Sequence, residues 1–223
     1  MEQDTTLATR IIHKPSNLIR KQRLDNDLHD FDDLFYVTAE SIDPLFPNFL
    51  YSGGSPSEWN KKFSLLFPNV GYRRLNTSEI FNYASHYLAL SSFSKKWCLV
   101  LEDDAIVPPR FRENLLEIIA SLPQSADVIY LGGGFPYLQV LNPILLKGKL
   151  LRSEHPCTNT SCAYLISRRA ALRALPWMYP FDAPIDVEFA FIQMRLNFEV
   201  YHCYPYIVEE GSKSIYRSTI ERQ

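Results

Sequence analysis

The sequence lacks the features that mark membrane-spanning, secreted and nucleic-acid-binding proteins. Its longest stretch without a charged residue, 128–146, is interrupted by glycines and prolines and makes a poor membrane span. The formal net charge is only -2, which argues against binding driven by nucleic-acid phosphates. The first residues are acidic and lead into no apolar run, so no signal peptide is expected.

Cysteine is also scarce: the chain has four, and no Cys-x-x-Cys pair occurs. Cys98, Cys162 and Cys203 lie in apolar, strand-like surroundings, so buried thiols in a reducing compartment are expected. Together with the missing leader and span, this predicts a cytoplasmic protein. At most it associates peripherally with a membrane, and no nucleic-acid partner is expected.

What is present is an alternation of strand-like and helix-like patterns along the 223 residues. This alternation predicts an α/β fold in one domain, 1–223, with a central, mostly parallel twisted sheet flanked by helices. Strands are expected at 9–12, 34–38, 97–101, 128–131, 162–166 and 200–208. Helices are expected from 16, over 57–66, over 76–91, after 109, after 167 and from 186.

Several of the expected helices carry recognisable capping residues. Ser16 and Ser167 are predicted N-caps, and Asn76 with Glu79 fits a capping box. The helix that starts at 186 is expected to turn Met194 and other apolar residues inward.

Three acidic residues, Glu102, Asp103 and Asp104, follow directly after the apolar run 97–101. A strand buried on both faces looks like this, and open α/β sheets bind ligands beyond the carboxyl ends of their strands. Adjacent carboxylates repel one another, and Mg²⁺ or Mn²⁺ would compensate them and bridge to a nucleotide diphosphate. Because side chains alternate, Glu102 and Asp104 are expected to face one ligand while Asp103 faces another way. The alternative is a solvated acidic turn.

Five segments occur in a fixed order from about residue 75 to residue 214. They are Leu75-Asn76-Thr77-Ser78-Glu79-Ile80 with Ser85-His86, Leu99-Val100-Leu101-Glu102-Asp103-Asp104, Asp127-Val128-Ile129-Tyr130-Leu131, Ala163-Tyr164-Leu165-Ile166-Ser167-Arg168-Arg169-Ala170, and Pro184-Ile185-Asp186. This ordered set resembles family 25 glycosyltransferases, the relatives of the lipooligosaccharide and collagen galactosyltransferases. Residues 1–74 match the family loosely, and Phe81-Asn82 stands where family members tend to have Gly-Cys.

The resemblance implies a GT-A-like fold and a hexosyltransferase that inverts the anomeric carbon. It implies a nucleotide-sugar donor, commonly UDP-linked, and a glycan or lipooligosaccharide-type acceptor. The cofactor it implies is Mn²⁺ or Mg²⁺, bound through Glu102 and Asp104.

Within this scheme Asp104 is the direct metal ligand, and Glu102 binds the metal or the donor ribose. Asp103 contacts the donor sugar or a metal-bound water. Inversion needs a general base for the acceptor hydroxyl, and Asp186 and Glu188 are the candidates. Asp is also a favoured N-cap, so Asp186 has a structural alternative.

Glu79, Asn82 and His86 share one face of the helix predicted over 76–91. That face is expected to line the donor site, with Glu79 and His86 as donor contacts. The structural alternatives are a capping-box role for Glu79 and a hydrogen-bonded core position for His86.

Two later features also have functional and structural readings. Glycines 132–134 would permit close approach to a ligand, but they lack the dinucleotide fingerprint, and a flexible loop is favoured. His202 could be a late metal ligand, and Tyr204 and Tyr206 could contact an acceptor. Packing within a strand is the favoured interpretation of all three.

Three other functions compete with sugar transfer. A nucleotidyltransferase would need a glycine-rich phosphate loop after the first strand, where this chain has Ile12-His13-Lys14-Pro15. An aspartyl phosphatase would need a nucleophilic Asp where Glu102 stands. A catalytically silent module that binds nucleotide sugars stays open, because binding and catalysis share most residues.

Overall fold

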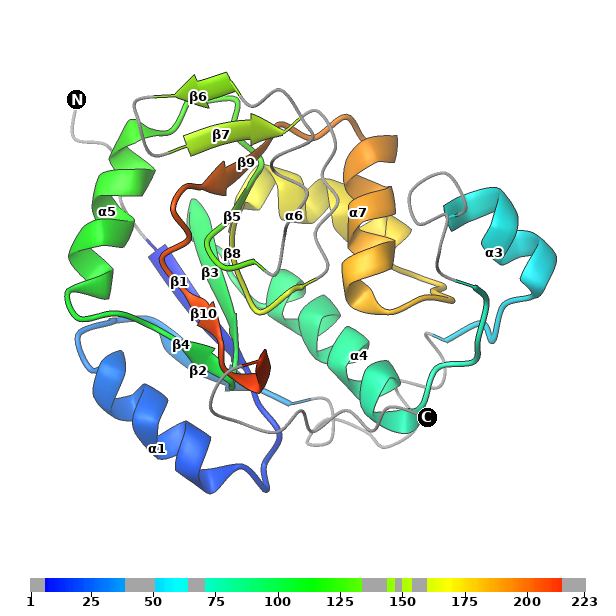
Figure 1. Cartoon of the computed structure of the whole chain (residues 1–223), viewed down its shortest axis with the longest axis horizontal. Coiled ribbons are helices and arrows are strands. Elements are labelled where there is room, and N and C mark those ends of the chain that lie inside the picture. The colour runs from blue at the N-terminus through cyan, green and yellow to red at the C-terminus, as the bar shows by residue number, and fades with distance from the viewer. Residues whose placement is uncertain are drawn as a thin grey trace.

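The computed structural model describes residues 7–38, 51–63, 71–133, 144–146, 150–153 and 160–213. Within these ranges the chain forms a twisted sheet with helices on both faces (Figure 1). The elements are β1 (Leu7–Ile12), α1 (Leu18–Asp27), β2 (Leu34–Val37), α3 (Pro56–Phe63), α4 (Thr77–Ser91), β3 (Trp97–Glu102), β4 (Ala105–Ile106), α5 (Phe111–Ser121), β5 (Val128–Tyr130), β6 (Ile144–Leu146), β7 (Leu150–Ser153), β8 (Ala163–Ser167), α6 (Arg168–Ala174), the 3-10 helix η3 (Leu175–Trp177), α7 (Ile185–Arg195), β9 (Val200–Cys203), β10 (Glu209–Glu210) and the 3-10 helix η4 (Gly211–Lys213).

The main sheet has eight strands in the order β2-β1-β3-β8-β5-β9-β7-β6. Strands β2, β1, β3, β5, β9 and β6 point one way, and β8 and β7 point the other way. The carboxyl ends of β1, β3 and β5 therefore meet at one edge, which is the edge where ligands bind in open α/β sheets. A separate two-stranded sheet joins β4 to β10.

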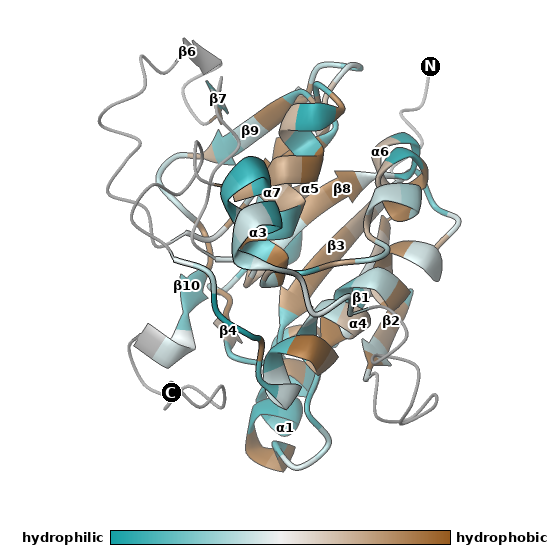
Figure 2. Cartoon of the chain, turned by 90° about the vertical axis from the view of Figure 1, so that its right-hand side faces the viewer, coloured by the Kyte–Doolittle hydropathy of each residue, from teal (hydrophilic) through white to brown (hydrophobic). Residues whose placement is uncertain are grey.

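Strand β3 shows how the sequence covers both faces of this sheet. Cys98 and Val100 point into a core that α4, α6 and α7 close, while Leu99 and Leu101 point into a second core beneath α1 and α5. Figure 2 shows the matching hydrophobic colouring along β3. Alternate side chains serve opposite faces, so a strand covered on both sides must be apolar throughout.

The fold class predicted from the sequence is confirmed: an α/β protein whose sheet strands mostly point the same way, flanked by helices. The assignment of 1–223 to one domain stays a prediction. Cys98, Cys162 and Cys203 are buried free thiols, as expected. Among the described residues, no helix has the length and apolarity needed to span a membrane.

Two of the three predicted helix caps are present. Ser167 Oγ accepts a hydrogen bond from the Ala170 N–H at 3.1 Å. Asn76 and Glu79 form the reciprocal capping box of α4. The prediction for Ser16 is wrong, because α1 has Asn17 at its N-cap without a side-chain cap bond. The Asn17 amide instead donates to Asp103.

Other local predictions need correction. Met194 is 38% exposed instead of facing inward. Phe189 of α7 packs into the core that α4, α6 and α7 close, and Val187 packs against α3. Apolar residues therefore occur all around the axis of α7, and their spacing does not indicate a single buried face. The strand predicted over 200–208 ends at Cys203. Further along, Val208 forms an isolated parallel bridge with Gly132, and β10 follows. The β6–β7 hairpin was not predicted.

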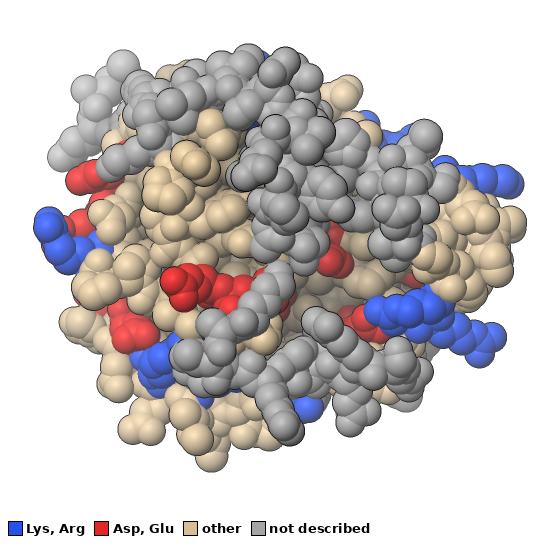
Figure 3. All heavy atoms as spheres, viewed as in Figure 1, with Lys and Arg blue, Asp and Glu red and all other residues tan. Residues whose placement is uncertain are grey.

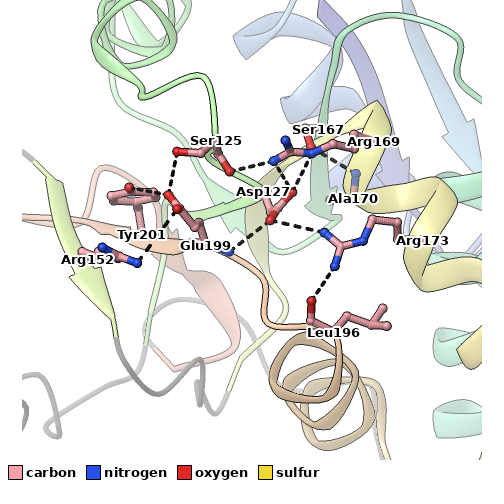
Figure 4. Close-up of polar contacts among 10 residues, drawn as sticks. All are labelled: Ser125, Asp127, Arg152, Ser167, Arg169, Ala170, Arg173, Leu196, Glu199 and Tyr201. Atoms are coloured by element: carbon pink, nitrogen blue, oxygen red, sulfur yellow. Dashed lines mark hydrogen bonds and ion pairs between the residues drawn. The ribbon is translucent and has the colours of Figure 1, made fainter.

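At the amino-terminal ends of β5 and β9, the buried residue Asp127 joins three elements (Figure 4). Its Oδ1 accepts from Arg169 Nε at 3.2 Å and from an Arg169 terminal nitrogen at 2.7 Å. Its Oδ2 accepts from the Glu199 N–H at 3.0 Å and lies 3.8 Å from an Arg173 nitrogen. This carboxylate therefore ties α6 to the starts of two strands, at the opposite end of the sheet from Glu102.

We expect Asp127→Ala to lower the free energy of unfolding by about 2 kcal/mol, the scale of hydrogen bonds to a buried charged group. Arg169 and Arg173 are largely exposed, so the Coulomb share of this loss is small. Urea denaturation measures the effect. Asp32→Ala is the control: it removes an exposed pair with Arg112 at 3.5 Å and should change stability by less than about 0.5 kcal/mol. Equal effects of the two substitutions would contradict the assignment.

Candidate active site

The acidic triplet sits at the carboxyl end of β3, as predicted. Glu102 is the last residue of β3, Asp103 and Asp104 form a turn, and β4 follows at once. The Asp104 carbonyl accepts from the Gly211 N–H at 3.0 Å, so the segment after β10 closes over the turn. Figure 3 shows acidic side chains gathered across the middle of this face of the molecule.

Glu102 is held by residues from two other elements. Its Oε1 accepts from Ser161 Oγ at 2.5 Å and lies 3.3 Å from His86 Nε2. Burial alone would raise the pKa of Glu102, but the hydrogen bonds of His86, Ser161 and Asn82 outweigh it and hold this pKa below its ordinary value. Glu102 is therefore a charged carboxylate at neutral pH, and its side chain stays 22% exposed.

The carboxylate of Asp104 has fewer hydrogen-bond partners than that of Glu102. Its Oδ2 accepts from the Ser212 N–H at 3.0 Å, whereas its buried Oδ1 has no hydrogen-bond partner among the residues that the structure describes. Burial, followed by the negative charge of Glu102, raises the pKa of Asp104 to about 6. Buried polar atoms are normally paired. An unpaired carboxylate oxygen beside a second carboxylate is the environment that a bound cation would relieve.

Asp103 faces away from this pair, as the alternation of side chains predicted. Its Oδ2 accepts from His13 Nδ1 at 3.1 Å, the Lys14 N–H at 3.1 Å and the Asn17 amide at 3.0 Å. Its Oδ1 accepts from Arg20 at 2.8 Å, and this set of donors overcomes burial and lowers the pKa of Asp103 to about 2. The predicted contact of Asp103 with donor sugar or metal-bound water is therefore corrected: its carboxylate fastens the β1–α1 loop to the acidic turn.

Asp186 is the second residue of α7 and belongs to the same electrostatic neighbourhood. Burial raises the pKa of Asp186 to about 6, and the negative charges of Glu102 and Glu79 add to the rise. Its Oδ1 accepts from the Val187 N–H at 3.0 Å. The N-cap alternative is wrong, because Pro184 occupies the N-cap. Asp186 is partly exposed, which leaves the general-base assignment open as a prediction.

Glu188 does not share the position of Asp186. Two residues along a helix correspond to a rotation of about 200°, so the two side chains leave α7 on opposite sides. Glu188 is 1% exposed, and its Oε1 accepts from Lys62 Nζ at 3.0 Å and from the Asp182 N–H at 2.9 Å. The prediction of Glu188 as a catalytic base is corrected on these grounds: its buried side chain lies in the α3–α7 interface and pairs with Lys62.

The environment of Glu188 makes stability depend on pH. Burial raises the pKa of Glu188 to about 7, against a partial lowering by Lys62. Because the folded-state pKa exceeds the unfolded one, the wild type loses stability as pH rises from about 4.5 to 7, by about 2–3 kcal/mol. We expect Glu188→Gln to lack this loss, so its stability relative to wild type should increase between pH 5 and pH 8 in urea titrations. Lys61→Gln, at an exposed neighbouring position on α3, is the control and should show the wild-type slope.

Glu79 and His86, which were predicted to share a role as donor contacts, have different surroundings. Both oxygens of Glu79 are occupied, by the Asn76 N–H in the capping box and by an ion pair with Arg73. Its predicted donor contact is therefore corrected to the structural alternative. His86 has no exposed surface and lies between Tyr164 and Glu102. It touches the acidic site through Glu102.

The features near β5 and β9 are packing features. A Cβ at Gly132 would lie 2.9 Å from the Val208 carbonyl, and one at Gly133 would lie 2.4 Å from the Tyr206 ring. These two glycines therefore allow close packing against the segment after β9, and the favoured flexible-loop interpretation is wrong for them. Gly134 lies outside the described residues. His202 is buried, which lowers its pKa to about 4, and it stacks on Tyr130, so the packing interpretation holds for it.

No protein-family model matches the sequence, and no curated protein matches it. Among solved structures, the chain is similar to the apo form of mouse xyloside xylosyltransferase 1. The two share 12% identity, the match covers 90% of this chain and 73% of that chain, and the TM-score is 0.41. No function is carried over at this distance. The resemblance to family 25 glycosyltransferases stays a prediction.

Sequence reasoning missed the residues that support the acidic turn. Ser161 and Tyr164 come from β8 and the residues before it, and Ser212 follows β10. Strand β8 enters the sheet antiparallel to β3, with Ala163 opposite Leu101, so the start of β8 lies beside the end of β3. No local pattern announces this pairing, because it depends on where β8 inserts.

Proposed function

We propose that the chain is a metal-dependent, inverting glycosyltransferase that moves a hexose from a nucleotide-sugar donor, such as a UDP-sugar, to a saccharide acceptor. The observation that carries this proposal is the buried Oδ1 of Asp104, which has no hydrogen-bond partner in the described part of the chain and lies next to the charged carboxylate of Glu102. The pair lies at the ligand-binding edge of the sheet, and Asp186 lies within the electric field of Glu102.

Asp104 and Glu102 would hold Mn²⁺ or Mg²⁺. The described residues contain no group of three His, Cys, Asp or Glu side chains suited to a metal ion. Two carboxylates suffice, because Mg²⁺-type sites commonly combine one or two carboxylates with substrate phosphates and water. When bound, the cation would stabilise the negative charge that develops on the diphosphate leaving group.

The remaining chemistry is assigned to Asp186. In a single displacement, the acceptor oxygen forms a bond to the anomeric carbon while the bond from that carbon to the donor diphosphate breaks. The acceptor hydroxyl must lose its proton, and a carboxylate with a pKa of about 6 is mostly ionised at neutral pH and can accept it. Asp103 has a supporting role: its carboxylate holds the β1–α1 loop against the acidic turn.

The test is donor hydrolysis and transfer by the whole chain over a panel of nucleotide sugars, with Mn²⁺ or with EDTA. We expect release of nucleoside diphosphate from at least one donor, with Mn²⁺ and not with EDTA. Thermal stabilisation by a donor without any release would instead support a silent binding module. Absence of both release and stabilisation across the panel would overturn the proposal.

A further inference from the structure

The ring of His86 is clamped from both sides. Its Nδ1 lies 3.0 Å from the Tyr164 hydroxyl oxygen, and its Nε2 lies 3.3 Å from Glu102 Oε1. The rings of His86 and Tyr164 are nearly parallel, with an interplanar angle of 16°. Both side chains are fully buried, so water does not compete for these hydrogen bonds.

The chemistry of the three groups fixes the direction of each hydrogen bond. Carboxylate oxygens accept hydrogen bonds, so Nε2 is the donating nitrogen of His86 in its contact with Glu102 Oε1. Burial raises the pKa of Tyr164 well above its ordinary value, so its hydroxyl keeps its proton and donates to Nδ1. The hydrogen bonds therefore run from Tyr164 through His86 to Glu102.

This series of hydrogen bonds ends at one oxygen atom of Glu102, the candidate metal ligand. Glu102 Oε1 accepts hydrogen bonds from His86 Nε2 and from Ser161 Oγ, so α4 and the residues just before β8 set the orientation of the carboxylate. Hydrogen bonds of this kind orient metal-binding carboxylates, and their loss typically weakens metal binding by about 10- to 100-fold.

We propose that His86, backed by Tyr164, is a positioning residue that holds the Glu102 carboxylate in place for the cation. This inference rests on the proposed function, because it requires Glu102 to bind metal. It departs from the expectation that His86 itself contacts the donor. It also differs from a purely structural role, in which His86 would support the core and leave metal binding unchanged.

The variants separate these roles through side-chain reach. In His86→Gln the amide nitrogen can take the place of Nε2 and still donate to Glu102, whereas the shorter side chain of His86→Asn reaches only the Nδ1 position. Tyr164→Phe removes the donor to Nδ1 and keeps the buried ring. Tyr83→Phe is the matched control, because Tyr83 is a fully buried tyrosine on α4 whose hydroxyl donates to the Met178 carbonyl.

The readout is the affinity for Mn²⁺ alone, measured on the full chain by water-proton relaxation, with urea denaturation in parallel. We expect His86→Asn to weaken Mn²⁺ binding by about 10- to 100-fold and His86→Gln to restore most of it. Tyr164→Phe should weaken binding about fivefold, the effect of one hydrogen bond, and Tyr83→Phe should leave it unchanged.

Wild-type Mn²⁺ affinity in both His86→Asn and Tyr164→Phe would overturn the positioning role, whatever their stability. If His86→Asn does not fold, Tyr164→Phe decides alone. Asp104→Asn separates this failure from that of the proposed function. If Asp104→Asn abolishes Mn²⁺ binding while the His86 and Tyr164 variants retain it, only the positioning role is contradicted. No Mn²⁺ binding by the wild type sinks both.

Discussion

Replacing Asp104 by Asn is expected to lower metal-dependent sugar transfer by roughly 10³-fold, the effect of losing about 4 kcal/mol of transition-state stabilisation. The substitution keeps the shape of the side chain and an oxygen that can accept from the Ser212 N–H. It removes the charge and can turn the Oδ1 position, which has no partner among the described residues, into an N–H donor that repels a cation. In EDTA the variant should be at least as stable as wild type, because burial and Glu102 disfavour the ionised carboxylate.

Nucleoside diphosphate release at varied Mn²⁺ concentration measures the effect, and urea denaturation in EDTA measures stability. Glu209→Gln is the matched control: the same carboxyl-to-amide change at an exposed position on β10, the strand that pairs with β4. It should keep the wild-type rate. A wild-type rate and a wild-type Mn²⁺ requirement in Asp104→Asn would remove Asp104 from the metal site.

The acidic turn could be predicted because its signal is local. An apolar run that stops at three acids fixes both the burial of β3 and the place of its end, and strand alternation predicted that Asp103 faces away from Glu102 and Asp104. What Asp103 faces could not be predicted. Its donors are 83 to 90 residues away in the sequence and meet it only because β1 pairs with β3.

The errors in the predicted site have a common physical origin. Glu79 lies in the segment 75–80 and Glu188 follows Pro184-Ile185-Asp186 by two residues, but an acid on a helix can occupy a cap or an interface as well as bind a ligand. Helix rotation separates Glu188 from Asp186, and Arg73 forms an ion pair with the carboxylate of Glu79. Which of these uses applies depends on tertiary partners, and those partners cannot be read from the motif.

Asp186 is the remaining candidate base, and the sequence could place it only at a helix start. The structure adds two properties that a base requires: partial exposure and a pKa raised to about 6 by burial and by the charges of Glu102 and Glu79. Ionised above this pKa, Asp186 can accept a proton at neutral pH. A cation bound by Glu102 would oppose the charge of Glu102 and draw the pKa of Asp186 downward.

Asp186→Asn should therefore reduce kcat by about 10²- to 10⁴-fold at saturating donor and acceptor, the usual contribution of a general base. The wild-type rate should fall as pH drops through about 6 or below, because protonation disables the base, and the variant should lose this acid limb. Mn²⁺ affinity should stay near the wild-type value, which distinguishes this loss from that of Asp104→Asn.

Glu188→Gln provides the matched control two residues away on the opposite side of α7, and it should retain kcat while changing only the pH dependence of stability. If Asp186→Asn keeps kcat within about threefold of wild type, or keeps the acid limb, another group takes the acceptor proton. Because Asp186 does not cap α7, a large loss of kcat in a stably folded variant could not be attributed to a lost helix cap. Loss of the Asp186 carboxylate would be its direct cause.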